Sequence, residues 1–70
     1  MKSINSPMAG TLMKVVMAVG DVVDFGDTVA ILESMKMEIP VEADRTGTIS
    51  KILVQEGEVV DEGTPLVELA

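Results

Sequence analysis

The stretch that decides the fold is Thr28–Glu42, which reads TVAILESMKMEIPVE. Its first part, Thr28–Leu32, is a short run rich in apolar and β-branched residues, and its last part, Met37–Glu42, alternates apolar and polar side chains as a half-buried strand does. Two strands this close together require a tight reversal between them, so we predict a hairpin with Lys36 at its exposed tip. The alternation assigns an inward side chain to Met37, Ile39 and Val41.

A repeat surrounds this stretch. Residues 10–32 align without a gap on residues 47–69, an offset of 37, with nine identities in 23 aligned positions. Gly10, Thr11 and Lys14, for example, fall on Gly47, Thr48 and Lys51. The chain is therefore predicted to contain two copies of one structural unit, joined through residues 33–46.

Each copy predicts three short strands separated by glycine-containing turns. The predicted strands are Thr11–Met17, Val22–Val23 and Val29–Leu32 in the first copy, and Thr48–Val54, Val59–Val60 and Leu66–Leu69 in the second. In the second copy, Ile49, Ile52 and Val54 can face one side only if the strand is irregular, so we expect a β-bulge near Ser50-Lys51. The pattern indicates an all-β fold.

One copy is too small to bury its own apolar face, whereas two copies related by a pseudo-twofold can do so as a flattened β-barrel or sandwich. The repeat also predicts where the hairpin lies. The position equivalent to Lys36 in the second copy lies just beyond the last residue of the chain. The hairpin that follows the first copy therefore corresponds, under the pseudo-twofold, to the place where the chain has its two ends. We therefore expect the tip at the opposite end of the molecule from both termini.

The composition limits the functions available to a single domain spanning residues 1–70. The chain has no cysteine and no histidine, so we expect no metal site, and a cytoplasmic location is consistent with the absent disulfides. Phe25 is the single aromatic residue and the net charge is −7, which argues against nucleic-acid binding and favours a monomer. No apolar run approaches the length needed to cross a membrane.

Lys36 is the one basic residue without a structural explanation. Lys2 is terminal, Arg45 lies in the loop before the second copy, and Lys14 and Lys51 are repeat mates. A lysine in a turn is commonly just solvated, but here methionines flank it on both sides, and methionine suits adaptable recognition surfaces. The other internal methionines, Met8, Met13 and Met17, are predicted to fill the core.

The segment Glu33–Met37, with the sequence ESMKM, resembles the attachment motif of the biotinyl domain family, usually Glu-Ala-Met-Lys-Met, whose lysine bears biotin. The repeat, the glycine turns and the start Pro7–Gly10 resemble that family as well. The likeness implies a barrel-sandwich hybrid of two four-stranded antiparallel sheets, closest to the small free-standing biotin/lipoyl attachment (biotin carboxyl carrier) proteins. Ser34 departs from the usual alanine, and the protruding thumb of some acetyl-CoA carboxylase carriers is absent.

The resemblance implies a non-catalytic carrier. A biotin protein ligase would acylate Lys36, recognising the tip through Glu33, Ser34, Met35 and Met37. The biotin would then act as a swinging arm that shuttles carboxybiotin between the biotin carboxylase and carboxyltransferase components of a carboxylase. The ligase is needed because a lysine side chain at neutral pH is an ammonium ion and not a nucleophile.

Two other functions stay open. A lipoyl carrier, or an acceptor of both biotin and lipoate, would use the same lysine, although lipoyl tips usually read Asp-Lys-Ala or Asp-Lys-Val. An unmodified assembly module would use the same fold without modification. An enzyme is not expected, because most of the acidic residues fall in turns of the two copies, where they are solvated: Asp21, Asp24, Asp27, Glu58, Asp61 and Glu62.

Overall fold

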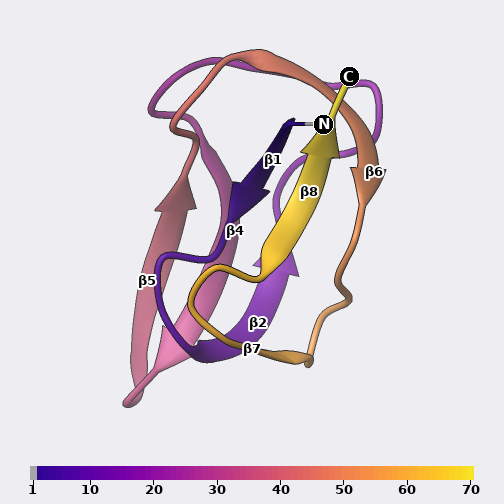
Figure 1. Ribbon diagram of the computed structural model, residues 1–70. Coiled ribbons are helices and arrows are strands. Elements are labelled where there is room, and N and C mark those ends of the chain that lie inside the picture. The colour runs from indigo at the N-terminus through magenta and orange to yellow at the C-terminus, as the bar shows by residue number, and fades with distance from the viewer. Residues whose placement is uncertain (1) are drawn as a thin grey trace.

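The computed structural model describes residues 2–70, and this range contains eight β-strands. Their bounds are β1 Lys2–Asn5, β2 Gly10–Val15, β3 Val22–Val23, β4 Thr28–Ser34, β5 Met37–Glu42, β6 Gly47–Ile52, β7 Val59–Val60 and β8 Pro65–Leu69. They form two four-stranded antiparallel sheets with the orders β1-β8-β6-β3 and β5-β4-β2-β7 (Figure 1). The predicted all-β fold of two four-stranded antiparallel sheets is therefore confirmed.

The internal repeat is visible in the strand bounds themselves. Adding the repeat offset of 37 to the bounds of β2 and β3 gives the bounds of β6 and β7. When each strand is replaced by its repeat mate, the order β1-β8-β6-β3 becomes β5-β4-β2-β7, the order of the other sheet. The hydrogen bonds follow the same rule. The Leu12 amide donates to the Glu58 carbonyl at 2.8 Å, and the amide of its repeat mate Ile49 donates to the Asp21 carbonyl at 2.9 Å. The two copies are related by the predicted pseudo-twofold.

The core lies between the two sheets and is built from pairs of repeat mates. The buried pairs include Leu12 with Ile49, Val23 with Val60, Val29 with Leu66, Leu32 with Leu69, and Ile4 with Val41. Each sheet contains strands from both copies, so neither copy could cover its apolar face by itself. Burying each of these side chains stabilises the fold by roughly 1.5–3 kcal/mol.

The strand that the sequence pattern did not identify is β1, which pairs with β8 at the edge of its sheet. Its residues are the repeat mates of β5, and Ile4 is buried as its mate Val41 is. Extending the repeat backward from Met37–Glu42 would have found this strand. Its short length and polar ends hide it from a search for strand periodicity alone.

The inward direction predicted for Met37 does not bury its side chain, which agrees with its predicted place at the exposed tip. Along the face that carries the inward residues of β5, Met37 is 65% exposed, Ile39 is half-buried and Val41 is buried. Burial therefore increases from the tip toward the middle of the molecule. The alternation is correct, but the hairpin extends beyond the opposing sheet, so nothing covers its outermost apolar side chain.

The prediction that Met13 fills the core is wrong, whereas Met8 and Met17 do pack partly buried against the core. Met13 is the extra residue of a bulge in β2, where the register shifts between Leu12 and Lys14, and it is 39% exposed. The predicted bulge in the second copy is confirmed by the register shift between Ile49 and Lys51. Both copies therefore carry the irregularity at the same position.

The hairpin tip and the termini lie at opposite ends of a molecule that measures 31 × 19 × 18 Å. Lys2 pairs with Leu69 at one end, and the reversal between β4 and β5 forms the other end (Figure 1). The predicted placement of the tip is therefore confirmed. Within residues 2–70, no helix has the length and apolar character that a membrane-spanning segment needs.

Candidate functional site

The tip of the β4–β5 hairpin is a two-residue turn formed by Met35 and Lys36. Ser34, the last residue of β4, pairs directly with Met37, the first residue of β5. Both turn residues have a positive φ, 52° for Met35 and 65° for Lys36. Positive φ at both central positions is the signature of a type I′ turn, whose twist matches that of the strands it joins.

These two residues are poorly suited to the backbone they adopt. Type I′ turns prefer Asn-Gly or Asp-Gly, because an L-residue with a larger side chain is strained by roughly 1–2 kcal/mol in the left-handed region. Within residues 2–70, Met35 and Lys36 are the two non-glycine residues with positive φ. Such strain concentrates at functional sites. The natural turn sequence is not the one that this backbone favours.

Replacing the turn by its preferred sequence tests this conclusion. We expect the double substitution Met35→Asn/Lys36→Gly to stabilise the domain by roughly 1–2 kcal/mol, because both residues tolerate positive φ. The melting temperature should rise by roughly 5–10 °C when thermal unfolding is followed by circular dichroism. A melting temperature that stays the same or falls would mean that the natural turn is not strained.

The side chains at the tip lie in solvent. Met35 is 92% exposed, and Lys36 and Met37 are exposed beside it. Within the part of the chain that the structure describes, the Lys36 amine makes no hydrogen bond and no ion pair. An enzyme approaching from solvent can therefore reach the amine without disturbing the domain.

Two carboxylates stand next to the tip. Glu33 on β4 and Glu38 on β5 are directly opposite each other across the hairpin, and both are exposed. Like charges at directly opposed positions weaken a sheet, so this pair does not stabilise the hairpin. Ser34 lies between Glu33 and the turn and is half-buried. The structure thus brings the predicted recognition residues together at one end, and it adds Glu38, which the sequence analysis did not assign to the site.

Gly10 supports the base of the hairpin. A Cβ atom at this position would lie 2.9 Å from the Glu33 carbonyl oxygen, closer than real side chains approach. The missing side chain lets β2 lie against β4 immediately below the tip. Gly47, its repeat mate, also has a close neighbour, but this is the Leu69 side chain, whose Cδ1 would lie 3.1 Å from an added Cβ. The shared glycine was visible in the repeat, but its contact with Glu33 depends on the tertiary structure.

Some of the acidic residues of the turns cap the backbone with their side chains. Asp21 accepts a hydrogen bond from the Ala18 amide at 2.8 Å, and its repeat mate Glu58 accepts one from the Gln55 amide at 3.0 Å. Asp44 forms an exposed ion pair with Arg45, whose hydrogen bond lowers the pKa of that carboxyl below its ordinary value. In residues 2–70, no three acidic side chains converge in a way that could hold a metal ion.

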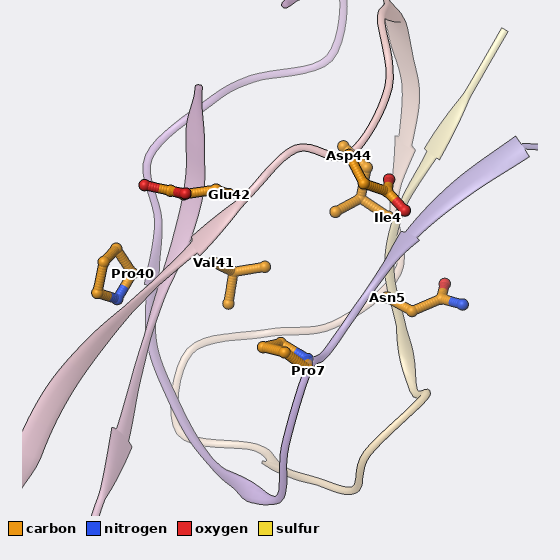
Figure 2. Close-up of a pocket in the computed structure, with 7 residues that line it drawn as sticks. All are labelled: Ile4, Asn5, Pro7, Pro40, Val41, Glu42 and Asp44. Atoms are coloured by element: carbon orange, nitrogen blue, oxygen red, sulfur yellow. The ribbon is translucent and has the colours of Figure 1, made fainter. Parts of the chain in front are cut away.

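A groove of about 420 Å³ lies away from the tip, between the edge strands β1 and β5. Figure 2 shows Pro40, Val41 and Glu42 on one side of this groove, and Ile4 and Asn5 on the other. Pro7 and Asp44 complete the lining. None of the seven lining residues carries an amine, hydroxyl or thiol that could be acylated, so the groove does not offer an attachment site.

Comparison with known proteins identifies this arrangement. The Biotin_lipoyl family model, described as "Biotin-requiring enzyme", matches residues 2–69. The chain belongs to the biotin/lipoyl attachment family. This biotin/lipoyl domain is 48% identical over 68 residues to the "Biotin/lipoyl attachment protein" of Bacillus subtilis (strain 168), an alignment that covers 97% of this chain and 93% of that protein.

Larger proteins contain similar domains. Over 67 residues, the biotin/lipoyl domain is 43% identical to the "Biotin-dependent acyl-coenzyme A carboxylase alpha3 subunit" of Mycobacterium leprae (strain TN), covering 96% of this chain and 11% of that subunit. The crystal structure of the Kluyveromyces lactis urea carboxylase contains a similar domain, with a TM-score of 0.89 and 38% identity over 99% of this chain and 6% of the carboxylase. The fold is therefore that of biotin carrier domains.

Proposed function

We propose that Lys36 is the covalent attachment site of biotin and that the domain is the mobile carrier of a biotin-dependent carboxylase. The observation that carries the proposal is the strained turn, in which Lys36 adopts a φ of 65° with its amine in solvent. A scaffold with no use for this amine would adopt a turn sequence of lower energy. The similarity to carrier domains of acyl-CoA and urea carboxylases supports the proposal.

Attachment requires a second protein. A biotin protein ligase would present an activated acyl group and accept the proton that the Lys36 ammonium must lose before its nitrogen can attack. Amide formation removes one positive charge and takes the net charge from −7 to −8. We assign recognition of the tip to Met35 and Met37, which offer apolar surface, and to Glu33 and Ser34 beside them.

The scaffold contributes position rather than reaction chemistry. Bound biotin supplies the ureido group that carries the transferred carboxyl. The hairpin projects from the end of the molecule opposite Lys2 and Ala70, so attachment through the termini would leave the tip free to visit two active sites (Figure 1). Tethering of this kind gives effective concentrations on the order of millimolar.

The experiment that tests the site is intact mass spectrometry combined with mapping of the modified peptide. We expect one biotin per chain, on Lys36, after incubation with ligase, biotin and ATP. Lys14 and Lys51 are internal controls because both are exposed lysines on the same molecule. Biotin on either control lysine in place of Lys36 would refute the assignment.

Lipoate is the second candidate cofactor, and the name of the Bacillus subtilis relative, a biotin/lipoyl attachment protein, supports it. Lipoyl and biotinyl groups differ in mass, so the intact mass of protein isolated from its source organism distinguishes them. A mass that never shifts, even with ligase, biotin and ATP present, would favour the unmodified assembly module.

The recognition role of the methionines predicts a kinetic effect. We expect Met35→Ala or Met37→Ala to slow biotin loading by about tenfold, because each change removes apolar contact area from the ligase interface. Stability should change by less than about 0.5 kcal/mol, since both side chains are exposed. Initial loading rates and thermal melting measured on the same preparations check both expectations. A large loss of stability with normal loading would assign the methionines to the core instead.

A further inference from the structure

Oxidising reagents have few targets in this protein. The chain contains no cysteine, tryptophan, tyrosine or histidine, so two-electron oxidants act on its six methionines. Among the methionines of residues 2–70, Met35 and Met37 are the most exposed, at 92% and 65%. Met13 follows at 39%, while Met8 and Met17 are partly buried against the core. Within the described range, the two most exposed methionines are thus the residues on either side of Lys36.

We propose that Met35 and Met37 form a paired, reversible oxidation site that controls whether other proteins can bind the tip. The inference rests on the proposed function of Lys36 and adds a regulatory modification to it. Peroxide is the chemical class of oxidant, and methionine sulfoxide is the product.

The reaction balances without a cofactor. The thioether sulfur attacks one oxygen of hydrogen peroxide, an S–O bond forms and the O–O bond breaks. The proton on the attacked oxygen passes to the departing hydroxide, which leaves as water. The sulfur loses two electrons and the peroxide gains them. Methionine sulfoxide reductases reverse the change: the oxygen leaves as water and a pair of thiols is oxidised to a disulfide.

Oxidation at these positions changes recognition and leaves the fold intact. Both side chains are exposed, and neither belongs to the buried core. Their sulfoxides stay hydrated in the free domain. A protein that covers the tip must remove water from two polar sulfoxide groups where it would otherwise meet apolar thioethers, and this penalty weakens binding.

The positions of the methionines also place the first oxidation at the tip of the hairpin. Met13 lies in the bulge of β2, outside the hairpin, and Lys36 stands between the two oxidisable side chains. Partial oxidation under mild conditions would therefore modify the tip before it reaches Met8 or Met17, whose oxidation would disturb packing.

The experiment is a brief treatment of the purified protein with dilute hydrogen peroxide, followed by peptide mapping and a loading assay. We expect sulfoxide at Met35 and Met37 before it appears at Met8 and Met17. The initial rate of loading by ligase, biotin and ATP should fall at least about tenfold, because two apolar contacts have become polar. Incubation with the two methionine sulfoxide reductases and a thiol should restore the rate.

Two variants isolate the cause. Met35→Leu/Met37→Leu changes the recognition surface itself, so its loading rate before peroxide is its own reference, and peroxide should leave that rate unchanged because leucine has no oxidisable sulfur. Met13→Leu removes an exposed methionine outside the hairpin and should stay as sensitive as the unmodified sequence. If the double leucine variant loads too slowly to measure, the test is the protein of natural sequence. Its loading rate should fall with peroxide and return after treatment with the reductases.

Two results would overturn the inference: equal oxidation rates for the tip and core-packed methionines, or an unchanged loading rate for protein fully oxidised at the tip. The proposed function fails in a different way. In that case the protein would not load before peroxide is added, and the inference would fall with it.

Discussion

Lys36→Arg is expected to reduce biotin loading to background while the domain stays folded. The guanidinium group remains protonated at all accessible pH values and its nitrogens are poor nucleophiles, so the acyl group has no acceptor. The positive charge is retained, and the position is exposed, so stability should change by less than about 0.5 kcal/mol. Streptavidin binding after incubation with ligase, biotin and ATP measures the loss.

The matched controls are Lys14→Arg and Lys51→Arg. Both are exposed lysines at equivalent positions of the two copies, and both variants should load at the normal rate. Streptavidin binding that persists in Lys36→Arg would show that another group carries the biotin. Loss of binding in the Lys14 or Lys51 variants would move the site away from the tip.

Leu12→Ala is expected to lower the free energy of unfolding far more than any substitution at the tip. Leu12 is fully buried between the sheets, and truncating a buried leucine costs about 2–5 kcal/mol through lost burial and the cavity left behind. A domain below about 80 residues seldom has more than about 3–5 kcal/mol from its core, so a large fraction of this variant should be unfolded at 37 °C. Urea denaturation followed by circular dichroism measures the change.

The repeat supplies an independent check on this prediction. Ile49 is the repeat mate of Leu12 and is buried to the same degree, so Ile49→Ala should cost a similar amount. Met13→Ala, next to Leu12 but in the exposed bulge, should cost much less. A small effect at both buried positions would mean that the two sheets are not held together by this core.

The position of the hairpin could be predicted from short-range patterns. Two strand-like runs separated by too few residues for any other connection require a reversal, and the chain places Met35 and Lys36 at its centre. The strained φ values could not be predicted, because neither residue signals a type I′ turn. They follow from the pairing of Ser34 with Met37, which leaves two residues to make the turn.

The architecture was available from the sequence for a different reason. A duplicated unit that cannot cover its own apolar face must pair with its copy, so the repeat of residues 10–32 at 47–69 was enough to predict two sheets related by symmetry. It also predicted a tip opposite the termini. Each of these conclusions depends on connectivity and periodicity, which are properties of the chain itself.

Which apolar side chains are covered was decided by the tertiary structure. Met37 lies on the inward face of β5, yet it is 65% exposed because the hairpin extends beyond the opposing sheet. Met13 is displaced outward by a bulge. Gly10 is needed because the Glu33 carbonyl of the neighbouring strand β4 leaves no room for a side chain. Alternation along a strand fixes the side to which a residue points. Whether anything lies on that side depends on where distant strands end, which local sequence does not encode.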